Sequence, residues 1–460
     1  MKAWNQFFIR HGWLLKENEM GEFDSTMETE TNLAFLFEVL QQARVEYIFG
    51  NDTLFIEDEP LLEEQWIQLL DFEYRGIGEG LWFRPGVDQP KIKELDTYVC
   101  GVVRQLNRLG FHTVGSCDGH GKKAPYVMVT RDRDITPLLE TLEVLGYKRV
   151  RSRENRKSYH IAFQMSRPEL FELAEKLSNI ERDWLEKGAQ FVKQQIFYEL
   201  LHQLLLIPGV SGDEGRVRDF VVEKLSPYVD HVSVDHAGNI LAEKTYRGGN
   251  GPVILLNAHL DTVFEFEPER KIIRDGNIWS SSKGILGADD RAGVAVLLHL
   301  AEHLQYSSFS GKVKFVFTVE EECGLIGAQQ VDEDFLKGTN AAIVVDRRGH
   351  GDIVTSSGGY IPFCDERYGV FFEQVALEEN LDGWKTTAGG SSDTRIWAEH
   401  GIQSVNLSVG YGNEHREGEF LDVEVCYQTT ELLKSVFQRG RELRAVLGEI
   451  GRESRIRNIS

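Results

Sequence analysis

The sequence predicts an α/β fold with a mixed central sheet and helices on both faces for residues 186–448, preceded by a separate α+β region. Two observations support this fold class. Residues 253–256 form a run of four branched apolar residues, which suits a central strand buried on both faces. Residues 292–304 are apolar on several sides, as expected of a helix that packs onto a sheet.

In the amino-terminal region we expect a segment of residues 1–90 and an α+β domain of residues 91–185, neither with a recognisable role. Residues 32–44 have the pattern of an amphipathic helix. In the second part, the hydrophobic patterns predict a helix at 94–109, strands at 111–114 and 126–130, a helix at 135–145, a hairpin at 148–163 and a helix at 168–177.

The segment GSCDGHGKKAPY at residues 115–126 brings Cys117 and His120 close together in the sequence. Structural zinc sites use four ligands, whereas this spacing supplies two. We therefore favour a Gly-rich turn over a metal or small-ligand loop. His112 is a third candidate ligand, but it fits better on a strand.

Polar helical sequence at 179–195 joins the two regions, and we place the domain boundary at residue 186. An amphipathic helix at 191–206 follows. Ser211 and Glu214 have the spacing of a capping box, which predicts that a helix begins there. Further elements are strands at 231–235, 240–245, 312–319, 341–345 and 402–407, a helix at 423–447 and an exposed tail at 449–460.

Composition restricts the partners and the compartment. The chain has 460 residues and a net charge of −22, which argues against nucleic acid or an anionic membrane as a partner. Its five cysteines are odd in number and show no disulfide spacing, which suits a reducing compartment. We see no secretory apolar core and no run of the roughly 18 apolar residues that a membrane span needs. We therefore expect a cytoplasmic protein.

Candidate metal ligands begin with His259 and Asp261, which come directly after the buried strand. Ligands bind at the carboxyl ends of strands in open α/β sheets, and residues two apart on an extended chain project the same way. A carboxylate beside a histidine can therefore orient its ring for a metal. A His-x-Asp tripeptide is common by chance, so its interpretation as a metal site needs further support.

That support comes from more ligand-type residues, each after an apolar strand or in a Gly-rich loop, which can converge at one sheet edge. They are Asp289 in GADD, Glu321 and Glu322 in TVEEECG, Asp346 after AAIVV, and His415 in YGNEHREGE. Together with His259 they make the ligand set of a two-zinc hydrolase.

The motifs NAHLDTV, GADDRAG and T-x-x-E-E-x-G, followed in order by Asp346 and His415, resemble those of zinc peptidases whose two metals share an aspartate. This group includes peptidase T, glutamyl aminopeptidases and bacterial leucyl aminopeptidases. The resemblance covers about residues 190–448 and implies a zinc aminopeptidase-like core. The intervals between the ligands leave no room for the inserted domains of some members.

The resemblance implies two Zn²⁺ ions per chain, for which Co²⁺ or Mn²⁺ can substitute. It also implies the role of each ligand: Asp289 bridges the ions, His259 and Asp346 complete one site, and Glu322 and His415 complete the other. Glu321 is then the general base. Asp261 holds His259, although a turn cap is its alternative role.

The loop TTAGGSSDTR resembles the segment that borders the substrate in this superfamily. The resemblance implies that Gly389 and Gly390 let the backbone approach the substrate and that Asp393 fixes the loop. Arg347, with Arg348 beside it, can grip a substrate carboxylate. The alternative for both arginines is an ordinary place on the surface.

The leading hypothesis is a metal-dependent exopeptidase, an aminopeptidase that hydrolyses short peptides. One alternative keeps the metals but cleaves another amide, as an N-acyl amino acid deacylase does. Another is a binding or regulatory protein with an ancillary metal site. Glu321 argues against that alternative, because a structural metal site needs no base. A homo-oligomer is compatible with all three.

Overall fold

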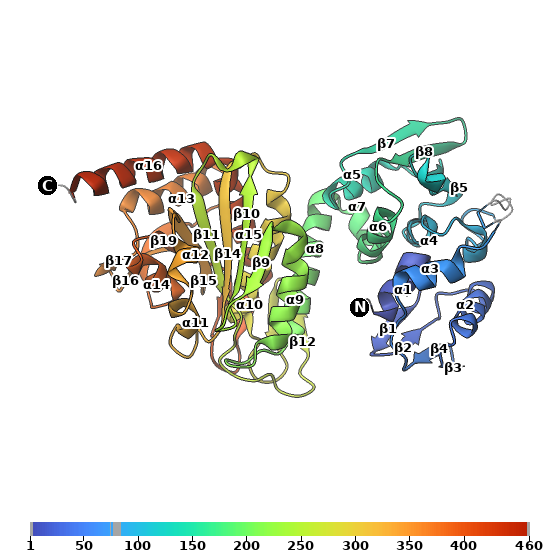
Figure 1. Ribbon diagram of the computed structural model, residues 1–460, viewed down its shortest axis with the longest axis horizontal. Helices are drawn as coiled ribbons and strands as arrows, with labels where there is room; N and C mark the ends of the chain where they lie inside the picture. Colours follow the sequence, from blue (N-terminus) through green and yellow to red (C-terminus); the bar gives the residue numbers. More distant parts are fainter. Residues whose placement is uncertain (1–2, 74, 77–83, 458–460) are drawn as a thin grey trace. The chain divides into compact units, whose positions relative to one another are not determined.

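The computed structural model describes residues 3–73, 75–76 and 84–457, which form two compact units (Figure 1). Unit 1 comprises Met1–Ile196 and unit 2 comprises Phe197–Ser460. The division falls inside helix α8 (Ala189–Leu206), about ten residues or three helical turns beyond the predicted boundary at residue 186.

A nine-stranded mixed sheet forms the centre of unit 2. Its four middle strands are parallel to one another, and the outer strands pair antiparallel except for a parallel pairing of the last strand, β18, with β16. In spatial order the strands are β17 (Ile361–Pro362), β16 (Asp352–Ser357), β19 (Gln403–Ser408), β15 (Ala341–Arg347), β11 (Val253–His259), β14 (Gly311–Thr318), β10 (Ile240–Tyr246) and β9 (His231–Val234), and β18 (Lys385–Gly389) pairs with β16.

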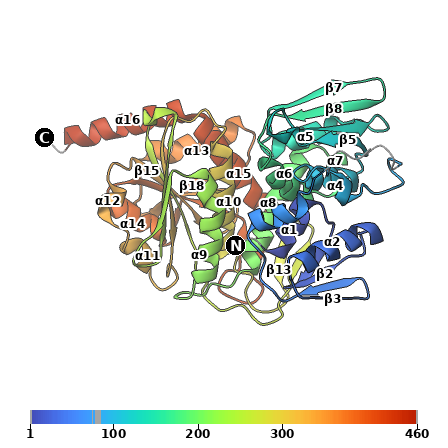
Figure 2. The same cartoon turned by 45° about the vertical axis from the view of Figure 1, so that its right-hand side comes forward.

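Helices cover both faces of this sheet, as the sequence predicts (Figures 1 and 2). Ile254 and Leu256 of β11 pack toward one set of helices, and Leu255 between them packs toward the other. The first set is the second half of α8 with α9 (Gly215–Leu225), α10 (Ala288–Leu304), α13 (Glu366–Glu378), α15 (Val423–Gln438) and α16 (Gly440–Arg457). The second is α11 (Ile326–Gln329), α12 (Glu333–Leu336) and α14 (Asp393–Glu399).

Helix α10 begins at Ala288, four residues before the predicted start at 292. Its first turn is irregular, since Asp289 and Asp290 have non-helical backbone angles and the peptide bond between them is cis. Gly287, directly before the helix, has φ 76°. A Cβ atom there would lie 2.7 Å from the Phe266 ring, so this position requires glycine both for its backbone angle and for space.

The carboxyl-terminal end differs from the prediction of one helix at 423–447 and an exposed tail. Two helices, α15 and α16, occupy this segment, and α16 continues to Arg457. Ile450 of the predicted tail is 4% exposed and packs in the core of unit 2. A smaller sheet in the same unit has the order β12 (Ile272–Asp275), β13 (Ile278–Ser281), β21 (Phe420–Asp422) and β20 (Tyr411–Gly412).

Unit 1 contains two antiparallel four-stranded sheets and seven short helices among its described residues. The first sheet has the order β1 (Lys16–Glu19), β2 (Glu22–Asp24), β4 (Thr53–Ile56) and β3 (Tyr47–Gly50). The second has the order β5 (Thr113–Cys117), β6 (Tyr126–Thr130), β8 (Ser158–Phe163) and β7 (Val150–Glu154). The helices are α1 (Trp4–His11), α2 (Glu30–Gln42), α3 (Glu63–Leu70), α4 (Cys100–Arg108), α5 (Thr136–Val144), α6 (Glu169–Ser178) and α7 (Arg182–Glu186).

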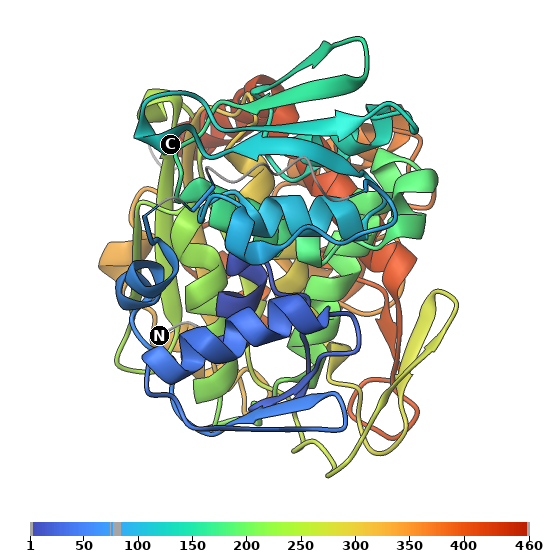
Figure 3. The same ribbon diagram turned by 90° about the vertical axis from the view of Figure 1, so that its right-hand side faces the viewer.

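One hydrophobic core runs through unit 1. It includes Trp13 and Trp66 from the first ninety residues together with Val103 and Phe163 from the following segment. The boundary predicted at residue 90 therefore lies within a shared core. Figure 3 shows helix α4 beside the second sheet; this helix begins at Cys100, later than the predicted 94. None of the described helices of either unit is long and apolar enough to cross a membrane.

Candidate metal centre

His259 ends the central strand β11 and is 2% exposed. Its Nε2 atom lies 3.0 Å from Oδ1 of Asp289 and 3.8 Å from Oδ1 of Asp346. Its Nδ1 atom lies 3.2 Å from Oδ1 of Asp261. One ring nitrogen therefore faces two carboxylates, while the other is held by a third.

Asp289 lies between two histidines. Its Oδ1 atom faces His259, and its Oδ2 atom lies 3.2 Å from Nε2 of His415. The same nitrogen of His415 lies 2.7 Å from Oε1 of Glu322. The donor atoms of Asp289, Glu322 and His415 are all within 4.8 Å of one another. The structure thus brings all five predicted metal ligands together at the carboxyl ends of the parallel strands.

The donor set fits divalent cations. Imidazole nitrogens and carboxylate oxygens are ligands of zinc and of similar metals. Glu322 Oε1 is buried and, although close to His415, accepts no hydrogen bond in a suitable direction. Burial beside Asp289 raises the pKa of Asp346 well above its ordinary value. A cluster of buried carboxylates is costly unless cations balance it, so these residues fit a metal centre.

Asp261 is fully buried, and its oxygens accept three hydrogen bonds from protein donors besides the contact with His259. They come from the hydroxyl of Ser211 at 2.8 Å and from the N–H groups of Glu321 at 3.0 Å and Glu322 at 3.1 Å. Burial acts to raise the pKa of Asp261, but these contacts, with His259 foremost, hold it at about 2. This carboxylate therefore orients the His259 ring and the loop that carries both glutamates.

The capping box predicted at Ser211 and Glu214 is wrong. Helix α9 begins at Gly215, and the Ser211 side chain donates to Asp261 instead of to the helix. Glu214 Oε1 accepts hydrogen bonds from the N–H groups of Gly212 and Glu320. Both residues of the supposed cap therefore support the loops around the site.

Glu321 lies next to the predicted ligand Glu322 and has a different electrostatic environment. Burial, reinforced by Asp346, Asp393 and Glu322, raises the pKa of Glu321 to about 10, against the attraction of His259. A carboxyl group in such surroundings binds a proton more readily than one in water. This applies to the metal-free chain, in which the Glu321 carboxyl holds its proton at neutral pH, and the positive charge of bound metal would favour the carboxylate that a general base requires.

Three residues that hold the ligands in place were not predicted. Glu419 is 2% exposed and accepts hydrogen bonds from four consecutive N–H groups of the turn before α10. The Tyr411 hydroxyl donates to Oδ1 of Asp346 at 2.9 Å. The Asn406 side chain accepts a hydrogen bond from the N–H of Asp346 and donates one to its carbonyl oxygen. Glu419 lies four residues after His415, and this proximity is the only sequence signal that points to it.

The predicted substrate-side residues are placed as follows. Gly389 ends β18, where a Cβ atom would lie 2.5 Å from Val354, so packing alone requires glycine there. Gly390 is exposed with open space around it. Asp393 is 1% exposed and accepts a hydrogen bond from the Thr318 hydroxyl, which favours fixing the loop over touching a substrate.

Both arginines after Asp346 form ion pairs. Arg347 Nε lies 3.0 Å from Oδ2 of Asp352, and Arg348 Nη1 lies 2.6 Å from Oε1 of Glu414. The side chain of Asp290, the residue after Asp289, also lies beside the site. It accepts hydrogen bonds from the N–H groups of His259 and Gly293, and it therefore shapes the turn.

Part of the chain is similar in sequence to known proteins. Residues 239–430 match the model of Peptidase family M28. A putative LysW-lysine/LysW-ornithine hydrolase of Pyrococcus abyssi is 31% identical over 270 residues, which cover 53% of this chain and 74% of that protein. The chain belongs to the metallopeptidase superfamily that includes Peptidase family M28. The resemblance that the motifs predict is therefore confirmed.

Other similar proteins carry peptidase names. The cytosol non-specific dipeptidase of Escherichia coli is 27% identical over 236 residues, and the match spans 48% of this chain but 45% of the dipeptidase. Among solved structures, aminopeptidase PepT of Bacillus cereus has 19% identity and a TM-score of 0.48, with coverage of 53% of this chain and 98% of that protein.

Proposed function

We propose that this metallopeptidase is an aminopeptidase that binds two zinc ions and hydrolyses short peptides. The observation that carries the proposal is the position of Asp289, whose two carboxylate oxygens face His259 and His415 separately. A carboxylate in this position can bind one metal with each oxygen. The dipeptidase among the relatives supports peptides as the substrate class.

Bound zinc would supply Lewis-acid polarisation of the scissile carbonyl and acidification of the attacking water. His259 and Asp346 would hold one ion, Glu322 and His415 the other, and Asp289 both. Asp261 keeps the His259 ring oriented through Nδ1, so that Nε2 faces Asp289 and Asp346, where the ion would bind. Glu321 accepts the proton of the attacking water and returns it to the leaving amine.

The test of the proposal is hydrolysis of matched peptides by the full chain before and after metal removal. We expect cleavage of dipeptides and tripeptides with a free amino terminus, loss of activity after dialysis against a chelator, and its return with zinc. Amino-terminally acetylated copies of the same peptides should be poor substrates. Preferential release of acetate from these copies would identify a deacylase and contradict the proposal, and so would cleavage that survives metal removal.

A further inference from the structure

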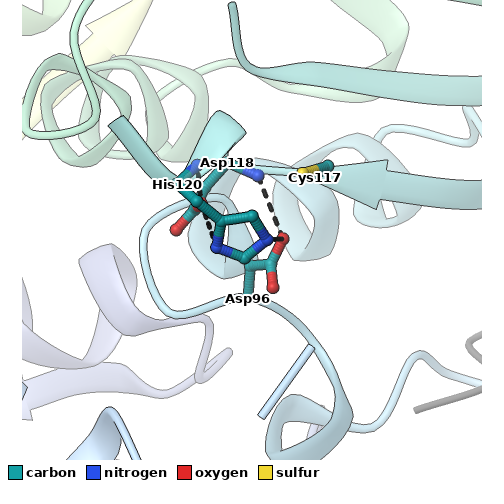
Figure 4. Close-up of side chains that lie close together, drawn as sticks. All are labelled: Asp96, Cys117, Asp118 and His120. Atoms are coloured by element: carbon teal, nitrogen blue, oxygen red, sulfur yellow. Dashed lines mark hydrogen bonds and ion pairs between the residues drawn. The ribbon is translucent and has the colours of Figure 1, made fainter. Parts of the chain in front are cut away.

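A second cluster of metal-ligating side chains lies in unit 1, in the loop that follows strand β5 (Figure 4). It combines Asp96, Cys117, Asp118 and His120, whose donor atoms all lie within 4.8 Å of one another. We propose that this loop binds a divalent transition-metal ion through Asp96, Cys117 and His120, with Asp118 as a positioning residue. The site is separate from the peptidase centre, whose residues all belong to unit 2.

Asp96 supplies the ligand that the local sequence lacks. Cys117 and His120 alone give two ligands, and the structure adds a carboxylate from a segment about 20 residues upstream. The Asp96 side chain is 5% exposed, and its Oδ2 atom accepts a hydrogen bond from the N–H of Asp118 at 3.1 Å. The same oxygen lies 3.9 Å from Nε2 of His120. His112, the other residue considered for this site, pairs with Asp132 instead.

His120 and Asp118 repeat the arrangement of His259 and Asp261. Nδ1 of His120 lies 3.5 Å from Oδ1 of the fully buried Asp118, and Nε2 faces the cluster. Asp118 also accepts a hydrogen bond from the N–H of His120 at 2.9 Å and pairs with Arg167 at 2.6 Å. With both oxygens engaged, Asp118 is suited to orient the imidazole, as carboxylates commonly do for metal-bound histidines.

The backbone of the loop brings the histidine back over Asp96. His120 has φ 47°, a left-handed conformation that non-glycine residues adopt uncommonly. Burial raises the pKa of the Cys117 thiol. The hydrogen bond that its sulfur accepts from the N–H of Gly119 at 3.3 Å acts in the opposite direction, and a metal ion that binds the sulfur displaces the thiol proton. Figure 4 shows the His120 ring next to the Asp96 carboxylate.

One sulfur, one nitrogen and one oxygen donor suit zinc, cobalt or ferrous iron better than calcium or magnesium. Tetrahedral coordination at about 2.0–2.3 Å separates neighbouring ligand atoms by roughly 3.3–3.8 Å, close to the 3.9 Å between Oδ2 of Asp96 and Nε2 of His120. The His120 side chain is 58% exposed, and three protein ligands leave a fourth position open to solvent. This composition is that of a site able to bind a further small ligand.

Cobalt binding to the metal-free full chain tests the proposal, because a thiolate ligand produces an intense near-ultraviolet charge-transfer band that carboxylate and histidine ligands do not. The peptidase centre has no cysteine among its ligands, so its occupation adds nothing to this band. Cys323 is exposed and follows Glu322 directly, which makes Cys323→Ser the matched control. We expect the band in the wild type and in Cys323→Ser, and its loss in Cys117→Ser.

His120→Gln gives a second measurement, since this exposed side chain is not needed for the core. Cobalt affinity judged from the same band should fall at least tenfold, and Asp118→Asn should reduce it by about tenfold or more, as loss of an orienting partner usually does. A folded wild type without the band, a band that survives in folded Cys117→Ser, or unchanged affinity in His120→Gln would each overturn the site. If Cys117→Ser does not fold, the His120→Gln titration decides.

Discussion

Glu321 and Glu322 are neighbours in sequence, but their different surroundings support different roles, a general base for Glu321 and a metal ligand for Glu322. Glu322 contacts His415 at 2.7 Å, whereas burial among carboxylates raises the pKa of Glu321. Glu321→Gln keeps the size of the side chain and removes the base, so we expect turnover to fall at least about a hundredfold while metal content stays at the wild-type level. Parallel measurements of kcat and bound metal check this.

Two further variants are compared with Glu321→Gln. Glu322→Gln should lose metal as well as activity, because it weakens a ligand. Glu320→Gln is the matched control, since the N–H of Glu320 bonds Glu214 while its side chain has no contact with the predicted ligands among the hydrogen bonds and ion pairs of the described residues. If Glu321→Gln loses metal and Glu322→Gln retains it, the two roles are exchanged.

As a proposed metal ligand, His415 is expected to make metal binding depend on pH. Hydrogen bonding to Asp289, together with the nearby charge of Glu322 and against the effect of burial, raises the pKa of His415 to about 9 in the metal-free chain. A metal binds the neutral ring, so below about pH 9 binding must displace this proton. Zinc affinity should therefore rise with pH, by up to about tenfold per unit from this group between about pH 7 and 9.

Competition with a chromophoric chelator across that range measures this dependence. The raised pKa of Asp346 acts in the same direction, because this carboxyl must also lose its proton to bind a metal. His415→Ala should lower the affinity and flatten its slope against pH. An affinity that is constant or falls as the pH rises would contradict the assignment of His415 as a ligand.

The turn that carries Asp289 depends on one buried side chain. Glu419 accepts hydrogen bonds from the N–H groups of Leu286, Gly287, Ala288 and Asp289, at 2.7–3.2 Å. Glu419→Gln replaces one acceptor oxygen by a donor and leaves buried N–H groups unpaired, at about 1–3 kcal/mol each. We expect unit 2 to unfold at lower denaturant concentration and to bind zinc more weakly. Glu417→Gln, at an exposed position of the same loop, should change neither, and equal behaviour of the two variants would refute the role of Glu419.

Elements with strong local patterns could be predicted, and those set by distant contacts could not. Strands β11, β14 and β15 lie in the middle of the sheet and are buried on both faces, so their apolar runs identify them. Helix α10 starts earlier than its apolar stretch because Gly287 and Glu419 shape its first turn. The metal ligands follow recognisable motifs, whereas Glu419 and Asp96 reach their partners across the sequence and leave no local pattern.

At the scale of the whole molecule, unit 2 contains every residue of the proposed centre. A fragment of residues 188–457 includes all of α8 and α16, and we expect it to fold and to bind zinc at the peptidase centre. A shorter fragment that ends at 448 loses the buried Ile450, and it should unfold at a lower temperature because burying a side chain of this size contributes about 1.5–3 kcal/mol. Circular dichroism and zinc titration of both fragments check this. An insoluble longer fragment would show that unit 1 is needed for the fold.

The most direct test of the two-metal centre is the zinc content of the purified full chain compared with that of Asp289→Ala. Cys117→Ser should be combined with both proteins so that the loop in unit 1 does not add to the count. The account predicts about two ions per chain with Asp289 present, and loss of most zinc from both positions without it, because each ion loses a ligand. One ion or fewer in the chain that retains Asp289, or two ions in folded Asp289→Ala, would contradict it.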